Sequence, residues 1–383
     1  MKTIYSIGSD FAGTGIGNTA YRAALGPYRH NVLTRLICLD YKESEISKDI
    51  IKHFRLLKYL IWYPLKAFQR YIFSGYNPYL FLDRLYDNLS LKHIDECDIF
   101  HGWRGHSKLA AMKAKRLGAK IITVNASSHP ISQNKILIDE YKKLGIKLKP
   151  YTKRQLKEAI EELNFADYVE VPSDFVYNSF IENGYPKKKL IKIPFGIDYE
   201  KYSYNKSKKD KRFRAIFVGS VNIRKGIHYL LQAWDELKLK DAELIICGRV
   251  WEDAKEIVKK YENNDTIKFL GFKKPQKWYE RSDVFVFPTI EEGSALVTYE
   301  AMACGLPLIT TYNSGTIAKD KKEALLIPLG DNEKLKESIL FMYNNRDKCK
   351  KMGLAARKTV EKYSWNNYGE NVFNAYEKIL SKK

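Results

Sequence analysis

This sequence has few cysteines, no long apolar run and a deficit of acidic residues. Its five cysteines, Cys38, Cys97, Cys247, Cys304 and Cys349, are scattered and never form a C-x-x-C pair. Neither a disulfide framework nor a zinc site is therefore indicated. No apolar run approaches the ~20 residues of a membrane-spanning helix. The first residues contain no apolar segment typical of a signal peptide, so we expect a cytoplasmic protein.

Acidic residues are outnumbered, and one segment contains none. The chain has 66 Lys and Arg against 45 Asp and Glu, a net charge of +21. Residues 50–82 contain no acid, and basic and aromatic residues alternate there: Lys52, Phe54, Arg55, Lys58, Tyr59, Trp62, Tyr63, Lys66, Phe68, Arg70, Tyr71 and Phe73. Such a segment suits the headgroup layer of an anionic membrane, which predicts peripheral membrane contact. The alternative is an ordinary amphipathic helix that packs its rings on the core.

Short apolar runs alternate with longer amphipathic stretches throughout the 383 residues. Ten runs have the length and β-branching of strands: 3–8, 32–39, 98–103, 120–126, 168–173, 213–220, 242–248, 266–272, 284–289 and 307–311. The alternation predicts an α/β protein with parallel sheets covered on both faces. Ligands should bind at the carboxyl ends of the strands.

The length and a lysine-rich stretch after "IKIPFG" predict two doubly wound, Rossmann-like domains facing a cleft. We place the first domain at 1–193 and the second at 194–362. Residues 363–383 should form a C-terminal helix that packs back towards the first domain.

The segment 284–316 reads as strand, loop, helix, turn and strand, and it carries Glu292 and Glu300 in an E-x(7)-E pattern. If the helix begins near Ser294, the amides of Gly293, Ser294 and Ala295 would bind an anion such as a diphosphate. The two carboxylates would then accept hydrogen bonds from sugar hydroxyls. Upstream, Arg224 and Lys225 follow another strand and could complete a phosphate clamp, although alone they would read as solvated charges.

Together these stretches resemble the C-terminal domain of the retaining glycosyltransferases of family 4, which have the GT-B fold. The resemblance rests on F-V-G-x(4)-R-K-G, the L-x-I-x-G strand at 244–248, F-L-G-F at 269–272, the E-x(7)-E pair and S-W-x-x-Y at 364–368. It covers about 170 residues strongly and the N-terminal half more loosely, through "GTGIGN", "DIFHGW" and "IPFGID".

The resemblance implies that the domain at 1–193 binds the acceptor and the domain at 194–362 binds a nucleotide sugar. It also implies that Lys225, with Arg224, neutralises the diphosphate of that sugar, and that Glu292 holds the transferred sugar. It implies a donor site made by Gly15, Gly248, Phe272, Gly293, Ser294, Ala295, Leu296 and Glu300, with Glu300 on the ribose. Gly248 and Phe272 fall at the nucleobase pocket. On the acceptor side we expect Gly13, Thr14 and His101. His101 lies at the end of the predicted strand 98–103 and would face the cleft, and the alternative is a hydrogen-bonded structural histidine.

Two positions depart from the family pattern. Ser220 stands where the family has an Arg, so Arg224 would supply that charge. Asn125 stands where it has a His, and His129, four residues later, is the remaining catalytic candidate, although a lone His in a polar loop is more often a surface residue.

No D-x-D occurs in the chain, so we expect transfer without a metal or other cofactor, with charge neutralisation by the cations and the helix N-terminus. The predicted function is transfer of a sugar from a nucleotide diphosphate sugar to a glycan or lipid-linked acceptor, with retention. Three alternatives stay open: an NAD-linked dehydrogenase using Gly13, Gly15 and Gly17, a nucleic-acid binder, and an inactive scaffold. The glycine spacing does not fit G-x-G-x-x-G, and no nucleic-acid-binding motif is present.

Overall fold

The computed structural model describes residues 1–71, 79–204 and 211–381, and it contains two parallel sheets. The first sheet has the strand order β3-β2-β1-β4-β5-β6-β7. Its strands are β1 (Thr3–Phe11), β2 (Leu33–Tyr41), β3 (Ile51–His53), β4 (Ile99–Trp103), β5 (Lys120–Val124), β6 (Tyr168–Val171) and β7 (Leu190–Lys192). The second sheet has the order β10-β9-β8-β11-β12-β13. It consists of β8 (Phe213–Val218), β9 (Ala242–Cys247), β10 (Ile267–Gly271), β11 (Val284–Phe287), β12 (Leu308–Thr311) and β13 (Ala324–Ile327).

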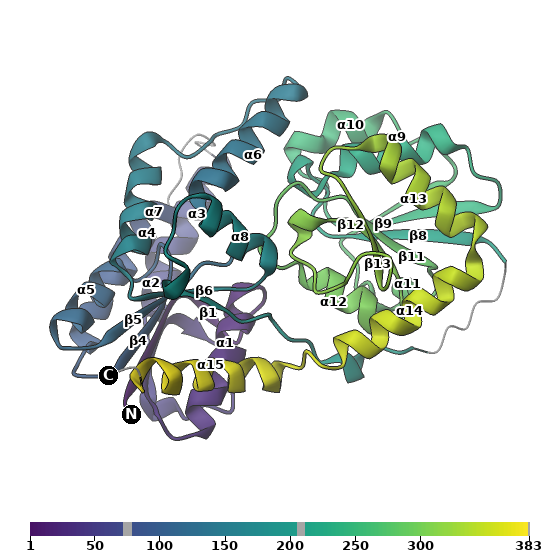
Figure 1. The fold of residues 1–383 in the computed structure, drawn as a ribbon. Helices are drawn as coiled ribbons and strands as arrows, with labels where there is room; N and C mark the ends of the chain where they lie inside the picture. Colours follow the sequence, from purple (N-terminus) through teal and green to yellow (C-terminus); the bar gives the residue numbers. More distant parts are fainter. Residues whose placement is uncertain (72–78, 205–210, 382–383) are drawn as a thin grey trace.

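Helices cover both faces of each sheet (Figure 1). Those of the first domain are α1 (Ile16–Arg29), α2 (Arg55–Leu57), α3 (Tyr63–Tyr71), α4 (Tyr79–Ser90), α5 (Lys108–Arg116), α6 (Pro130–Lys143), α7 (Lys153–Phe165) and α8 (Asp174–Glu182). The later ones are α9 (Ile227–Leu237), α10 (Lys255–Lys259), α11 (Gln276–Tyr279), α12 (Leu296–Ala303), α13 (Asn332–Asn344), α14 (Arg346–Val360) and α15 (Trp365–Leu380). The predicted α/β class and the ten predicted strands are confirmed, whereas β3, β7 and β13 were not predicted.

Alternate side chains of β1 pack into two hydrophobic clusters on opposite faces of the first sheet. Tyr5 and Ile7 pack with α1 and α15, whereas Ile4 lies in a second cluster on the opposite face of the sheet. Such alternation is the two-residue period of a strand buried on both faces.

The last helix returns to the first domain, as predicted. Figure 1 shows α15 alongside α1, and Trp365, Tyr368 and Tyr376 of α15 are buried in the core of the first domain. The two helices approach closely because both carry a glycine: a Cβ on Gly26 would come within 1.9 Å of the Gly369 carbonyl oxygen. The chain therefore connects its two domains twice.

Candidate active site

The E-x(7)-E segment connects β11 to α12, but its helix begins later than predicted. Leu296 is the first helical residue, not Ser294. The N–H of Ala295 donates to the Ser314 carbonyl, and the Ser294 hydroxyl donates to the Gly315 carbonyl. The prediction that the Ala295 amide binds an anion is therefore wrong, because that donor is occupied inside the protein.

Arg224, Lys225 and Glu292 lie together at the carboxyl ends of β8 and β11. The two cations stand in a short 3₁₀ turn, and Asn222 caps that turn through the Lys225 amide. Arg224 Nη1 lies 2.7 Å from Glu292 Oε1, and Lys225 Nζ bonds the same oxygen. The structure thus brings these three predicted residues together. The sequence did not predict that Glu292 would pair with both cations in the unliganded protein, or that Glu291 Oε2 would lie 3.7 Å from Arg224 Nη1.

Glu300 lies in the second turn of α12, held by two tyrosines. Its Oε2 accepts a hydrogen bond from the Tyr279 hydroxyl at 3.1 Å, and the Tyr202 hydroxyl donates to the same carboxylate. Burial raises the pKa of Glu300, while the two hydroxyl donors oppose that shift. The carboxylate is therefore fixed in direction before any ligand arrives.

The predicted nucleobase residues follow neighbouring strands, Gly248 after β9 and Phe272 after β10. A Cβ on Gly248 would lie 1.7 Å from the Gly219 carbonyl oxygen, so only glycine fits there. The Phe272 ring is 90% exposed. It is a surface against which a base could pack, not the wall of an enclosed pocket.

Gly13, Thr14 and Gly15 form the loop between β1 and α1. Gly15 caps α1 with φ +60° and has open space around it, and Thr14 is exposed. The loop folds back on Asp10, because the Gly13 amide donates to the Asp10 carbonyl at 3.1 Å. A bare stretch of backbone therefore lies at the carboxyl edge of the first sheet, as predicted.

The expectation that His101 faces the cleft is wrong. His101 lies within β4 and is wholly buried, with Nδ1 2.6 Å from the Tyr376 hydroxyl of α15 and Nε2 3.4 Å from Glu170. Burial lowers its pKa to about 3, so the ring is neutral. It joins the last helix to the sheet and cannot reach an acceptor.

His129 caps α6 and is enclosed. Its Nδ1 accepts the Ile131 amide at 3.4 Å, and its ring packs edge-on against Phe180. Burial and the nearby Arg104 lower its pKa to about 4. Asn125, which replaces the expected histidine, accepts a hydrogen bond from Arg104. The catalytic assignment of His129 stays a prediction, and the geometry gives it a capping role.

Glu291 is a residue that the sequence reasoning missed. Its side chain is wholly buried and joins the domains, since Oε1 accepts from the amide and hydroxyl of Ser128 and Oε2 from Gln133. The backbones also meet here, because a Cβ on Gly293 would lie 1.6 Å from the Ala126 carbonyl oxygen. Leu296 packs against the cores of both domains. The loop that carries Glu292 is thus clamped against the first domain.

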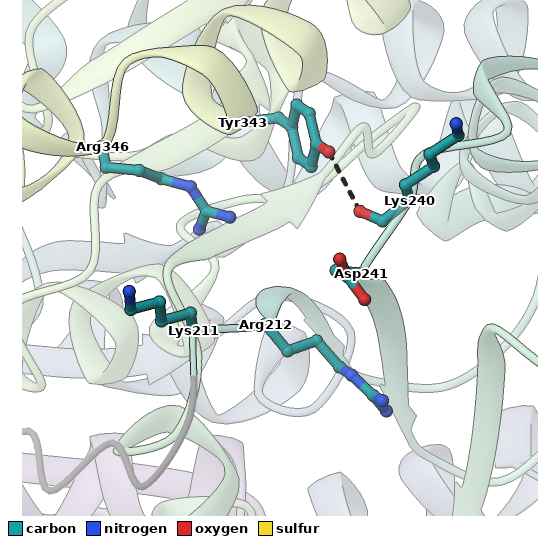
Figure 2. Close-up of a pocket in the computed structure, with 6 residues that line it drawn as sticks. All are labelled: Lys211, Arg212, Lys240, Asp241, Tyr343 and Arg346. Atoms are coloured by element: carbon teal, nitrogen blue, oxygen red, sulfur yellow. Dashed lines mark hydrogen bonds between the residues drawn. The ribbon is translucent and has the colours of Figure 1, made fainter.

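Two cavities differ in position: one lies at the carboxyl end of a strand and the other at the amino ends of two strands. One, of about 580 Å³, opens at the carboxyl end of β1. The other, of about 440 Å³, lies at the amino ends of β8 and β9, and Figure 2 shows its lining side chains, Lys211, Arg212, Lys240, Asp241, Tyr343 and Arg346. Only the first lies at the edge where parallel sheets bind ligands.

Among residues 1–71, 79–204 and 211–381, no helix is long and apolar enough to cross a membrane. The same residues contain no group of three or more His, Cys, Asp or Glu side chains placed to hold a metal ion.

Comparisons with known proteins agree with this architecture. Residues 198–359 match the family model described as glycosyl transferases group 1. An uncharacterised glycosyltransferase of Methanocaldococcus jannaschii is 29% identical over 236 residues, covering 58% of this chain and 65% of that protein. The capsular polysaccharide biosynthesis glycosyltransferase CapM of Staphylococcus aureus is 24% identical over 246 residues, covering 59% of this chain and 65% of CapM. The matches thus span less than two thirds of these relatives.

Solved structures match over nearly the whole chain. Anabaena HepE, in crystals with UDP and with UDP-glucose, superposes with a TM-score of 0.68 at 15% identity, covering 99% of this chain and 100% of HepE. At that identity the likeness establishes the fold, which is GT-B.

Proposed function

We propose that the chain transfers a sugar from a nucleotide diphosphate sugar to an acceptor, because residues 198–359 match the family model of the group 1 glycosyl transferases. The observation that carries the proposal is the arrangement of Arg224 and Lys225 around Glu292 at the carboxyl edge of the second sheet. Glu291 Oε2 lies 3.7 Å from Arg224 Nη1, so two carboxylates face the two cations, and a diphosphate would bind by displacing Glu292 from them. Glu300, oriented by its tyrosines, suits the ribose hydroxyls.

The chemistry follows from charge. As the glycosidic bond breaks, negative charge grows on the leaving diphosphate, and Arg224 and Lys225 stabilise that charge. The two side chains supply the positive charge that a divalent metal would otherwise supply to the diphosphate, so the proposed reaction needs no metal. With HepE binding UDP-glucose in the same fold, a nucleotide sugar is the natural donor class. We further propose retention of configuration, with the acceptor attacking from the face that the leaving group vacates.

Mass spectrometry of donor hydrolysis tests the proposal. The protein is incubated in EDTA with UDP-, GDP- and ADP-linked hexoses, and release of the nucleoside diphosphate is measured. We expect release from at least one donor, and strongly reduced release by Lys225→Ala. A matched control is Lys277→Ala, an exposed lysine of α11. No release from any donor would overturn the proposal.

The acceptor, in our proposal, is a glycan or lipid-linked saccharide at the cytoplasmic face of a membrane. The supporting observation is a helical face that points its apolar side chains outward. Leu56, Tyr59, Leu60 and Tyr63, the apolar stripe, recur at intervals of three and four residues, and all four are exposed. Leu56 and Leu60 are 74% and 71% exposed. An exposed apolar stripe on a basic protein is typical of a helix lying in a membrane interface.

The structure changes the expected source of the attachment energy. Lys58 is buried and bonds Asp10 at 2.7 Å and Asp40 at 3.1 Å, and Arg55 bonds Asp40. Phe54 and Leu57 pack on the core, as the amphipathic-helix alternative predicted. The side chains of Lys66 and Arg70 lie outside the described part of the structure, as does Phe73. We therefore assign most of the attachment to the stripe, where each leucine contributes about 1–2 kcal/mol on leaving water.

Co-sedimentation with liposomes of phosphatidylglycerol and phosphatidylcholine tests this attachment. We expect Leu56→Ser with Leu60→Ser to reduce binding by about tenfold or more, because most of the leucine surface then stays in water. The matched control is Leu340→Ser with Leu354→Ser, two exposed leucines of the second domain. Equal binding by the stripe variant and the wild type would mean that the acceptor is not presented through this face.

A further inference from the structure

The 580 Å³ cavity at the carboxyl end of β1 has a lining unlike that of the donor site. Asp10 comes from β1, Asp83 from α4 and His106 from the loop after β4. Lys58, Trp62 and Tyr63 come from the helical segment that follows β3. The volume is within the range of small-molecule sites, roughly 300–1,000 Å³. The cavity thus combines two carboxylates and two large rings.

Asp83 is the polar group in this cavity without an internal role. Among the described residues its carboxyl group has no hydrogen-bond or ion-pair partner, whereas Asp10 is bonded to Lys58. Burial and the nearby Glu162 and Asp87 raise the pKa of Asp83 to about 7. The Nδ1 of His106 has no partner either, and it is buried, whereas Asp83 is only half-buried. Buried polar groups are normally satisfied, so an unsatisfied nitrogen that lines a cavity indicates a polar ligand.

The charge of the lining narrows the class of ligand. Asp10 is paired with Lys58, and Asp83, whose pKa lies at about 7, is partly ionised at neutral pH. The residues that line the cavity therefore offer no unpaired cation to a phosphate or a uronic acid. A neutral molecule rich in hydroxyl groups would instead donate hydrogen bonds to Asp83, and its C–H face would pack on a ring such as Trp62. Uncharged sugars have both features.

We propose that this cavity binds the uncharged terminal sugar of the acceptor, with Asp83 accepting hydrogen bonds from its hydroxyls and Trp62 packing against its ring. The inference rests on the proposed function and adds the acceptor class and its recognition residues. The cavity and the apolar stripe share Tyr63, which lines one and belongs to the other. A sugar in the cavity can therefore stay attached to a lipid that lies along the stripe.

Saturation-transfer NMR on the full chain tests the cavity directly. The probes are the methyl glycosides of glucose, mannose, galactose and N-acetylglucosamine, with methyl glucuronide as the anionic comparison. We expect at least one neutral glycoside to bind, and binding to weaken by about tenfold in Asp83→Asn and in Trp62→Ala. Asp49→Asn and Trp251→Ala, exposed residues away from the cavity, are the controls and should bind as the wild type does.

Three results would overturn the inference: no neutral glycoside binds the wild type, binding persists unchanged in both cavity variants, or the glucuronide binds as well as the neutral sugars. Thermal melting establishes whether the variants are folded. If Asp83→Asn or Trp62→Ala does not fold, Tyr63→Leu, at the exposed rim of the cavity, is tested in its place. Calorimetry with UDP and GDP is run on the same samples. Sugar binding without nucleotide binding would reject the proposed function, whereas nucleotide binding without sugar binding would reject the cavity alone.

Discussion

Replacing Glu292 by glutamine should strengthen nucleotide binding. In the unliganded protein Glu292 bonds both Arg224 and Lys225, so a diphosphate has to compete with its carboxylate for the two cations. Glutamine keeps the size of the side chain and removes the negative charge. A hydrogen bond to a charged group contributes about 1.5–3 kcal/mol, and a diphosphate that no longer has to displace one should bind about tenfold more tightly.

The same substitution should weaken the free protein. Lys225 is only 12% exposed at its side chain, and Arg224 is 35% exposed. Glu291 Oε2, 3.7 Å from Arg224 Nη1, stays in place in the variant, so the loss falls mainly on Lys225 and should cost less than the roughly 3 kcal/mol of breaking a buried pair. Bound nucleotide then supplies the missing anion. The rise in melting temperature on adding UDP or GDP should consequently be larger for Glu292→Gln than for the wild type.

Calorimetry and thermal melting at matched nucleotide concentrations check both halves of this prediction. Glu243→Gln is the control, because Glu243 also pairs with arginine but at the amino end of strand β9, away from the candidate site. Sugar release from the donor should fall in Glu292→Gln even as nucleotide affinity rises, since the carboxylate is expected to hold the transferred sugar. A nucleotide affinity lower than that of the wild type would refute the competition argument.

Three further outcomes are expected. Glu300→Gln should weaken nucleotide binding by about tenfold while the Tyr279 bond survives, as calorimetry and melting can establish; unchanged affinity would exclude a ribose contact. Donor hydrolysis should be the same in EDTA and in Mg²⁺, and activity restored only by the metal would contradict a metal-free reaction. Burial raises the pKa of Glu170 to about 7 from 4.5. Between these two values the folded state holds a proton that the unfolded state has released. The free energy of unfolding should therefore fall by on the order of 3 kcal/mol as the pH rises from about 4.5 to 7. Glu170→Gln should lack this loss in melts at pH 5 and pH 8, and parallel wild-type and variant profiles would refute it.

The strands were predictable because each was a short, β-branched apolar run, and runs of that kind are buried on both faces in parallel sheets. The three unpredicted strands, β3, β7 and β13, have three or four residues and lie at or near sheet edges, where burial demands less apolar character. The apolar pattern of the sequence therefore predicted the central strands of each sheet better than the edge strands.

The arrangement was predictable where the residues follow strand ends of one sheet, and not where a partner comes from the other domain or from a distant helix. Arg224, Lys225 and Glu292 follow strand ends, and strand ends of one parallel sheet meet. His101 also stands near a strand end in the sequence, but its environment is set by α15, which begins more than 260 residues later. Glu291 was missed for a similar reason, since its partners Ser128 and Gln133 belong to the other domain. A doublet of acids beside a glycine is a weak signal that one of them is structural.

The membrane segment shows the same limit. Its composition predicted an interface, but nothing in residues 50–82 indicates that Asp10 and Asp40 would bury Lys58. Ion pairs with these two aspartates thus bury Lys58, the basic residue at the centre of the segment, whereas the apolar stripe stays exposed.

The central claim, that Arg224 and Lys225 bind a nucleoside diphosphate, is tested most directly by calorimetric titration of UDP and GDP in EDTA into the wild type, Arg224→Ala and Lys225→Ala. The account predicts metal-free binding of at least one nucleotide by the wild type and a loss of about tenfold or more in each variant. No binding by the wild type, or equal binding by all three proteins, would contradict it.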